Sequence, residues 1–186
     1  MIQELVDRLD FAGALKTCAS NDLLPPRQDD KVVGEVGNRF VEHLKKQVAD
    51  GRYEPDRASF VQVPKPGLTS RPAALLTLTD RVVYEALVNL LRPSVAKYLI
   101  DDDVVFWPRE VPTLKRWQEF ERSPLATQHR YIVQADVSGF YESIDHDQME
   151  DDLVKASGDP LLSNVLRTFL SRVMGARRGI PQGLTR

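Results

Sequence analysis

The chain has 186 residues, of which 42% are hydrophobic and 28% are charged, so it can bury a core and fits one domain or part of a larger protein. Its formal net charge is −2. This excludes a global positive field that would attract nucleic acid, so any binding of nucleic acid must rest on local basic clusters.

The N-terminal region is predicted to be helical. Apolar residues recur at spacings of three or four over residues 2–17, which predicts an amphipathic helix. Residues 23–30 contain two consecutive prolines and are predicted to form a linker. A second helix is predicted over residues 38–49, and Gly51 is expected to end it.

A basic hairpin is predicted next. Residues 59–63 alternate and are rich in β-formers, which indicates a strand. Residues 64–67 are predicted to turn the chain, and an extended return segment follows. Lys65 and Arg71, on neighbouring segments, could together hold a polyphosphate. Surface cations without a ligand are the alternative interpretation.

The pattern from residue 79 to residue 92 has a helical period. Thr79 or Asp80 is predicted as the N-cap, and Pro93 is expected to interrupt the helix. Residues 101–103 are three aspartates, which we interpret as a solvated acidic turn because consecutive side chains diverge.

A single carboxylate then stands out. The apolar run of residues 131–133 predicts a strand that delivers Asp136 to its end, and Ser138 and Gly139 are turn formers. A carboxylate beside a tight turn whose carbonyls can face a cation suits Mg²⁺. The alternative is an aspartate that caps a strand-to-helix junction.

Two helices are predicted after this segment, over residues 146–156 and 161–173, and both are expected to pack beneath the sheet that holds Asp136. Asp145 lies nine residues from Asp136. We interpret it as the N-cap of the first of these helices and not as a second metal ligand.

The last stretch combines two cations, Arg177 and Arg178, with glycines and a proline. Glycines let a backbone approach a base or a sugar closely. Gln182 offers both a donor and an acceptor at such a position.

Three blocks, in order, resemble reverse transcriptases, most closely the group II intron, retron and abortive-infection branches. The stretch from Asp136 to His146, with Tyr141 five residues after the first aspartate, is similar to motif A of that family. Residues 63–87 look like the fingers region, and residues 178–183, which end in Pro-Gln-Gly, look like motif B. The resemblance covers about two thirds of the chain.

The resemblance implies an α/β fold of the α+β kind, mostly helical with a small antiparallel sheet. Residues 1–58 would form an N-terminal helical region and residues 59–130 the fingers of a right-hand polymerase. Residues 131–186 would form an incomplete palm that lacks the family's aromatic-x-Asp-Asp motif.

The implied activity is that of an RNA-directed DNA polymerase, which adds deoxynucleotides to a primer by phosphoryl transfer with two Mg²⁺ ions. Asp136 would be the catalytic carboxylate and a metal ligand, together with the carbonyl of Val137. The family's other essential carboxylates belong to the aromatic-x-Asp-Asp motif, which none of the 186 residues form. The chain alone is therefore expected to have little or no polymerase activity.

The same resemblance implies a nucleotide site. The basic residues Lys65 and Arg71 would touch the triphosphate of the incoming nucleotide. Tyr141 would lie beneath its sugar and exclude a 2′-hydroxyl. Gln182 and Gly183 would position the nucleotide and the template base opposite it.

The implied partners are an RNA template, a DNA or RNA primer and deoxynucleoside triphosphates. A C-terminal continuation or a partner chain would supply the missing carboxylates, and in the second case the chain is half of a split polymerase. The remaining alternative is a non-catalytic nucleic-acid-binding or regulatory module. A loose match at residues 106–109 favours a retron or antiviral-defence enzyme over an intron maturase.

The cellular location follows from simpler features. One cysteine, Cys18, excludes an internal disulfide and fits a reducing compartment. No apolar run approaches the roughly 20 residues of a membrane span, and the N-terminus lacks a basic signal-peptide start. We therefore expect a cytoplasmic protein without a membrane partner.

Overall fold

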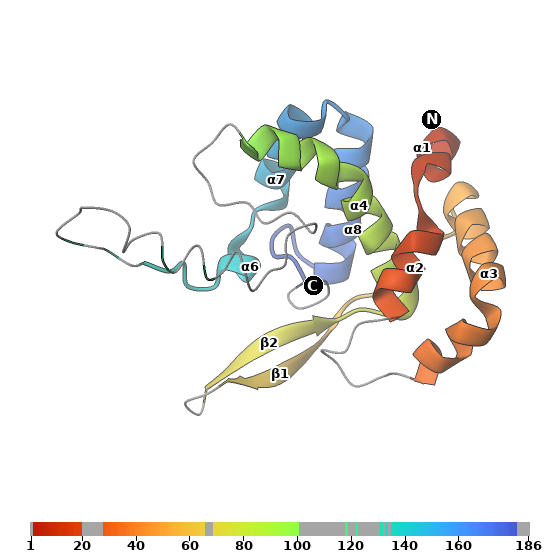
Figure 1. Cartoon of the computed structure of the whole chain (residues 1–186), viewed down its shortest axis with the longest axis horizontal. Coiled ribbons are helices and arrows are strands. Elements are labelled where there is room, and N and C mark those ends of the chain that lie inside the picture. The colour runs from red at the N-terminus through yellow and green to blue at the C-terminus, as the bar shows by residue number, and fades with distance from the viewer. Residues whose placement is uncertain are drawn as a thin grey trace.

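The computed structural model describes residues 2–19, 28–65, 69–100 and 135–181, and four single residues between 118 and 133. The described part is mostly helical, with one two-stranded antiparallel sheet, so the α+β class is confirmed (Figure 1). None of its helices is long and apolar enough to cross a membrane. The elements are α1 (Ile2–Arg8), α2 (Phe11–Ala19), α3 (Gln28–Ala49), β1 (Ser59–Lys65), β2 (Thr69–Leu75), α4 (Leu78–Ile100), α6 (Phe140–Ser143), α7 (His146–Ser157) and α8 (Pro160–Met174).

Helix α4 is the centre of the fold. It contacts α2 and α3 on one side and α7 and α8 on the other (Figure 1). Its apolar residues are not confined to one stripe, as expected for a helix that packs against neighbours on several faces. The core that surrounds it includes side chains from α1, α2, α3, α4, α8 and the end of β2, among them Val6, Ala14, Leu44, Ala74, Val82, Leu87, Leu162 and Leu170.

The N-terminal helices differ from the prediction in two ways. The single helix expected over residues 2–17 is two helices, because Asp10 begins a new one by accepting a hydrogen bond from the Gly13 N–H at 2.8 Å. The linker expected over residues 23–30 is wrong at its end, since α3 already begins at Gln28. Two prolines forbid a helix only at their own positions and just before them.

The predicted hairpin is confirmed and is longer than expected. Its register runs from Ser59 opposite Leu75 to Lys65 opposite Thr69. Lys65 therefore belongs to β1 and not to the turn, whose residues 66–68 lie outside the described part. Both strands contain a proline, which a two-stranded sheet tolerates because each strand has an open edge. The hairpin projects from the helical body (Figure 1).

The start of α4 is a buried polar cluster. The helix begins at Leu78, so the N-cap predicted at Thr79 or Asp80 is wrong by two or three positions. Thr77 takes that place, because the Asp80 N–H donates to its Oγ1 at 3.2 Å and this hydroxyl donates to Asp80 Oδ2 at 2.6 Å. Pro93 lies inside the helix and does not end it.

Helices α7 and α8 lie where they were predicted, within one residue at each end. Asp145 caps α7, as expected, by accepting hydrogen bonds from the N–H groups of Asp147 and Gln148, both at 3.0 Å. Both helices pack on α4 and on each other. The expectation that they pack beneath a sheet is wrong for the part of the chain that the structure describes.

Tyr84 of α4 is expected to make the fold less stable at alkaline pH. Its ring stacks on Phe169 at a centroid distance of 5.8 Å, and burial, together with the charge of Glu85, raises its pKa from 10.0 to about 12. Because the unfolded chain loses this proton first, stability is complete below pH 10 and falls by about 3 kcal/mol as the pH rises toward 12.

We expect Tyr84→Phe to flatten this part of the pH profile, measured as the free energy of unfolding in urea between about pH 9 and 11. Tyr98→Phe is the matched control, because Tyr98 lies on the same helix with half of its side chain exposed. Equal slopes for the wild type and Tyr84→Phe would contradict this assignment.

Candidate functional site

The segment that carries Asp136 is exposed. Tyr131, Val133 and residues 135–137 lie in neither helix nor strand, so the strand predicted over residues 131–133 is wrong at its two described positions. Val133 is 91% exposed. A strand needs a neighbouring strand that takes up its backbone hydrogen bonds, and the one sheet in the described part of the chain consists of β1 and β2.

The turn after Asp136 has the predicted character. Gly139 adopts φ 60° and ψ 34°, a left-handed conformation that favours glycine, and α6 starts directly after it. The hydroxyl of Ser143 donates to the Gly139 carbonyl at 2.7 Å and closes this short helix. Phe140 and Tyr141 are both exposed, with their rings edge to face at 5.5 Å. Tyr141 is thus accessible from solvent.

Two blocks that are more than 30 residues apart in sequence meet beside α6. Asp145 forms an isolated antiparallel bridge with Arg178. The His146 N–H donates to the Arg177 carbonyl at 3.0 Å, and the Gly179 N–H donates to the Ile144 carbonyl at 2.8 Å. The Ile180 N–H donates to the Tyr141 carbonyl at 2.9 Å. The segment that contains Tyr141 is therefore tied by backbone hydrogen bonds to the segment that precedes Gln182.

Three other carboxylates near this junction, Asp145, Asp147 and Glu150, have structural partners. Backbone hydrogen bonds from Gln148 and Asp147, with the nearby charge of Arg177, lower the pKa of Asp145. Arg177 Nη2 lies 2.6 Å from Asp147 Oδ2, which fixes the loop after α8 to α7. Arg167 Nε of α8 lies 2.7 Å from Glu150 Oε2.

Asp136 differs from these acids. Its Oδ1 accepts a hydrogen bond from the Val137 N–H at 3.0 Å, and the residue is exposed. A carboxylate has about four acceptor positions, so this bond leaves room for a cation. Mg²⁺ prefers such oxygen ligands and keeps several waters. Asp136 and the Val137 carbonyl fit the ion as partial ligands, although no group of three or more His, Cys, Asp or Glu converges among the described residues.

The predicted nucleotide contacts are described only in part. Lys65 lies opposite Thr69 and Arg71 lies opposite Val63, so the two basic positions are two steps apart along one ladder. Gln182 and Gly183 lie outside the described residues, directly after the buried Pro181. The expected convergence of these four residues with Asp136 stays a prediction.

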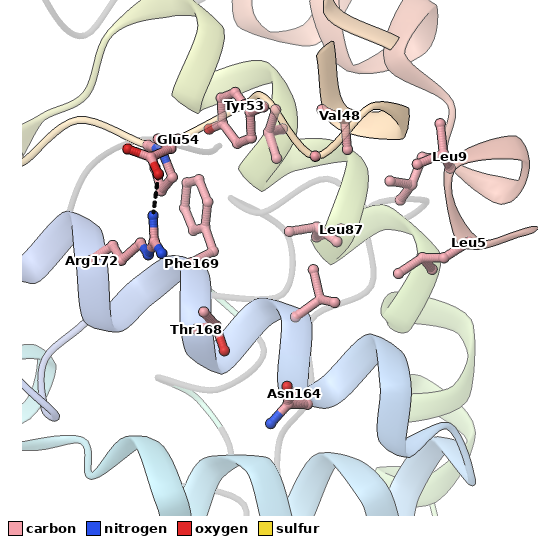
Figure 2. Close-up of a pocket in the computed structure, with 15 residues that line it drawn as sticks. Leu5, Leu9, Val48, Tyr53, Glu54, Leu87, Asn164, Thr168, Phe169 and Arg172 are labelled. Atoms are coloured by element: carbon pink, nitrogen blue, oxygen red, sulfur yellow. Dashed lines mark ion pairs between the residues drawn. The ribbon is translucent and has the colours of Figure 1, made fainter. Parts of the chain in front are cut away.

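The described part of the chain also contains hollows, one beside this junction and one further away. A groove of about 500 Å³ at the end of α8 is lined by three arginines, Arg57, Arg172 and Arg177, and by Pro55, Ser171, Gly175 and Ala176. An apolar pocket of about 350 Å³ lies between α1, the end of α3, α4 and α8, with the Glu54–Arg172 ion pair of 3.5 Å at its rim (Figure 2). Its apolar lining gives it no catalytic pair, so we place the candidate site at Asp136.

The sequence predicted no structural role for His146, which stands only at the end of the motif A stretch and at the start of a predicted helix. The residue is fully buried, and both of its ring nitrogens have partners, Ser171 and Gly179. A histidine directly after a capping aspartate is not a signal for such a role. Only the return of residues 177–180 to this place reveals it.

Comparison with known proteins adds no assignment. No protein-family model matches the chain, and no curated protein matches it. A function must be argued from the arrangement of the residues themselves.

Proposed function

We propose that this chain forms the fingers and the first part of the palm of an RNA-directed DNA polymerase. The observation that carries the proposal is the junction of residues 141–146 with residues 177–180. Residues 141–146 belong to the block that resembles motif A, and residues 178–180 belong to the block that resembles motif B. In such an enzyme the two blocks must flank one nucleotide. Their proximity was not used to recognise either block, so it supports the proposal independently.

The proposed function would give the residues the following roles. Asp136 and the Val137 carbonyl would hold Mg²⁺, which activates the primer 3′-hydroxyl and neutralises the triphosphate when it is bound. Tyr141 would support the sugar, and its carbonyl accepts a hydrogen bond from the N–H of Ile180, two residues before Gln182 in the sequence. Lys65 and Arg71, at positions on the hairpin, would bind the triphosphate.

The basic groove at the end of α8 supplies a local site for template phosphates, which the net charge of −2 makes necessary. Two of its arginines already have acidic partners, since Arg172 pairs with Glu54 and Arg177 pairs with Asp147. Phosphate must therefore compete with these carboxylates, and binding should be moderate and sensitive to salt.

A non-catalytic nucleic-acid-binding module is the second candidate. The observation in its favour is that no three metal-ligating side chains converge in the described part of the chain. For the polymerase proposal, this means that further carboxylates come from a continuation or a partner chain. We accordingly expect no primer extension by the chain alone.

Binding of template and nucleotide distinguishes the two candidates. We expect an RNA template annealed to a DNA primer to bind the chain more tightly when Mg²⁺ and the next complementary deoxynucleotide are both present. Fluorescence anisotropy of a labelled primer measures this. Salt-sensitive binding that is indifferent to Mg²⁺ and nucleotide would instead identify the non-catalytic module.

Tyr141 is expected to select the sugar. Tyr141→Ala should reduce the preference of the chain and its template–primer for a deoxynucleotide over the matching ribonucleotide by about 10- to 100-fold, because the ring no longer meets the 2′-hydroxyl. Competition between the two triphosphates for a fluorescent nucleotide measures the ratio. Phe140→Ala is the matched control, since Phe140 is the adjacent exposed aromatic residue. An unchanged ratio in Tyr141→Ala would disprove this role.

A further inference from the structure

His146 is a buried polar residue at the meeting point of three segments. It begins α7, its Nδ1 lies 2.8 Å from Ser171 Oγ of α8, and its Nε2 lies 2.6 Å from the Gly179 carbonyl oxygen. None of its side-chain surface is exposed. An imidazole that is buried in this way is costly unless both nitrogens are hydrogen-bonded.

The partners define the proton positions. A carbonyl oxygen can only accept, so Nε2 must carry the proton that it shares with Gly179. In the neutral ring Nδ1 is then an acceptor, and the Ser171 hydroxyl donates to it. Ser171 thereby orients the ring, and the ring in turn holds the carbonyl.

Gly179 is held on three sides. Its φ of 92° favours glycine, and an added Cβ would lie 3.2 Å from Met174 Cε and 3.5 Å from the Glu142 carbonyl oxygen. Its N–H donates to Ile144, and the N–H of the next residue, Ile180, donates to the Tyr141 carbonyl. Among these hydrogen bonds, the one from His146 Nε2 to the Gly179 carbonyl is the one that a side chain makes.

We infer that His146 is a positioning residue that locks residues 177–181 against α6. Helix capping does not explain it, because Asp145 already caps α7. Through Gly179 and Ile180 it fixes the backbone that leads to Gln182 relative to Tyr141. An effect of His146 on nucleotide binding rests on the proposed function. The inference that His146 holds residues 177–181 against α6, here called the His146 lock, does not.

Two variants distinguish the roles of the two ring nitrogens of His146. The side-chain amide nitrogen of His146→Gln lies near the position of Nε2 and can still donate to Gly179. The amide of His146→Asn lies near Nδ1 and can reach only Ser171. Both remove the ring, so they are matched in the loss of packing.

The readout is hydrogen–deuterium exchange of the Gly179 and Ile180 amides in the full chain, followed by NMR without nucleotide. We expect exchange about tenfold faster in His146→Asn and within about threefold of the wild type in His146→Gln. The amides of Leu166 and Leu170 in α8 report on global stability and should not change.

If the Gly179 and Ile180 amides exchange at the same rate in the wild type and in His146→Asn, the inference is overturned. It is also overturned if these amides exchange equally fast in both variants while the α8 amides exchange as in the wild type. If both variants unfold, Ser171→Ala decides, because it removes only the hydroxyl that orients the ring. Faster exchange at Gly179 then supports the lock, and unchanged exchange overturns it. If the lock is observed and the wild type binds no nucleotide, it is the proposed function that fails.

Discussion

Replacing Asp136 with alanine should weaken Mg²⁺-dependent binding of a deoxynucleoside triphosphate by more than about 100-fold, because loss of a direct ligand exceeds the 10- to 100-fold effect of an outer-shell residue. Asp136 is an exposed carboxylate beside the turn at Gly139, and its Oδ1 accepts a hydrogen bond from the Val137 N–H. Isothermal titration of the chain and its template–primer with Mg²⁺ and the complementary nucleotide measures the loss. Asp136→Ala should leave the fold intact, since the residue is exposed.

Asp145→Asn is the matched control for this variant. Asp145 lies nine residues further along, and its carboxylate accepts two backbone hydrogen bonds at the start of α7. Asparagine caps a helix about as well as aspartate, so stability and nucleotide binding should both be retained. If Asp145→Asn lost as much nucleotide affinity as Asp136→Ala, the assignment of a single metal-binding aspartate would be wrong.

Replacing Asp80 with alanine should lower the free energy of unfolding by about 3 to 5 kcal/mol, because three donors lose their acceptor in a buried place. The Tyr53 hydroxyl and the Thr77 hydroxyl both donate to this carboxylate at 2.6 Å, and the Asp56 N–H donates at 3.3 Å. Only 2% of Asp80 is exposed. Burial and the bond to Asp80 also raise the pKa of Tyr53, which keeps this donor protonated.

Urea unfolding followed by circular dichroism measures this loss. Asp80→Asn keeps one acceptor oxygen and should lose less than Asp80→Ala. Tyr53→Phe removes a single donor and should cost about 1 kcal/mol. A loss below about 1 kcal/mol for Asp80→Ala would show that water replaces the carboxylate and that the cluster is not stabilising.

The cluster around Asp80 also bears on function. It holds residues 53–56 against α4, and the Ala58 N–H then donates to the Val173 carbonyl at 2.9 Å, directly before β1. These bonds fix the root of the hairpin that carries Lys65 and Arg71. A destabilised cluster should therefore weaken triphosphate binding even though it touches no nucleotide.

The elements that could be predicted from the sequence are those with local signals. Helices α7 and α8 have clear apolar periods, and each follows an aspartate that caps it, Asp145 and Asp159. The hairpin has alternating strands. The split between α1 and α2 was missed because the cap at Asp10 lies inside an uninterrupted apolar period.

The arrangement of the candidate site could not be predicted in the same way. The bridge between Asp145 and Arg178 and the lock at His146 join segments that are more than 30 residues apart, and no local pattern encodes such a pairing. The prediction of a strand before Asp136 was wrong at its described positions for a related reason. Its β-branched residues favour a strand, but a strand forms only beside a partner.

Photocrosslinking tests the proposed polymerase site most directly. The chain would be irradiated with a template–primer, Mg²⁺ and a photoreactive deoxynucleoside triphosphate, and the labelled residue would be mapped by mass spectrometry. We expect labelling within α6 or residues 177–181 that requires Mg²⁺ and is lost in Asp136→Ala. Labelling elsewhere, or labelling of these residues that persists without Mg²⁺ and in Asp136→Ala, would contradict the proposal.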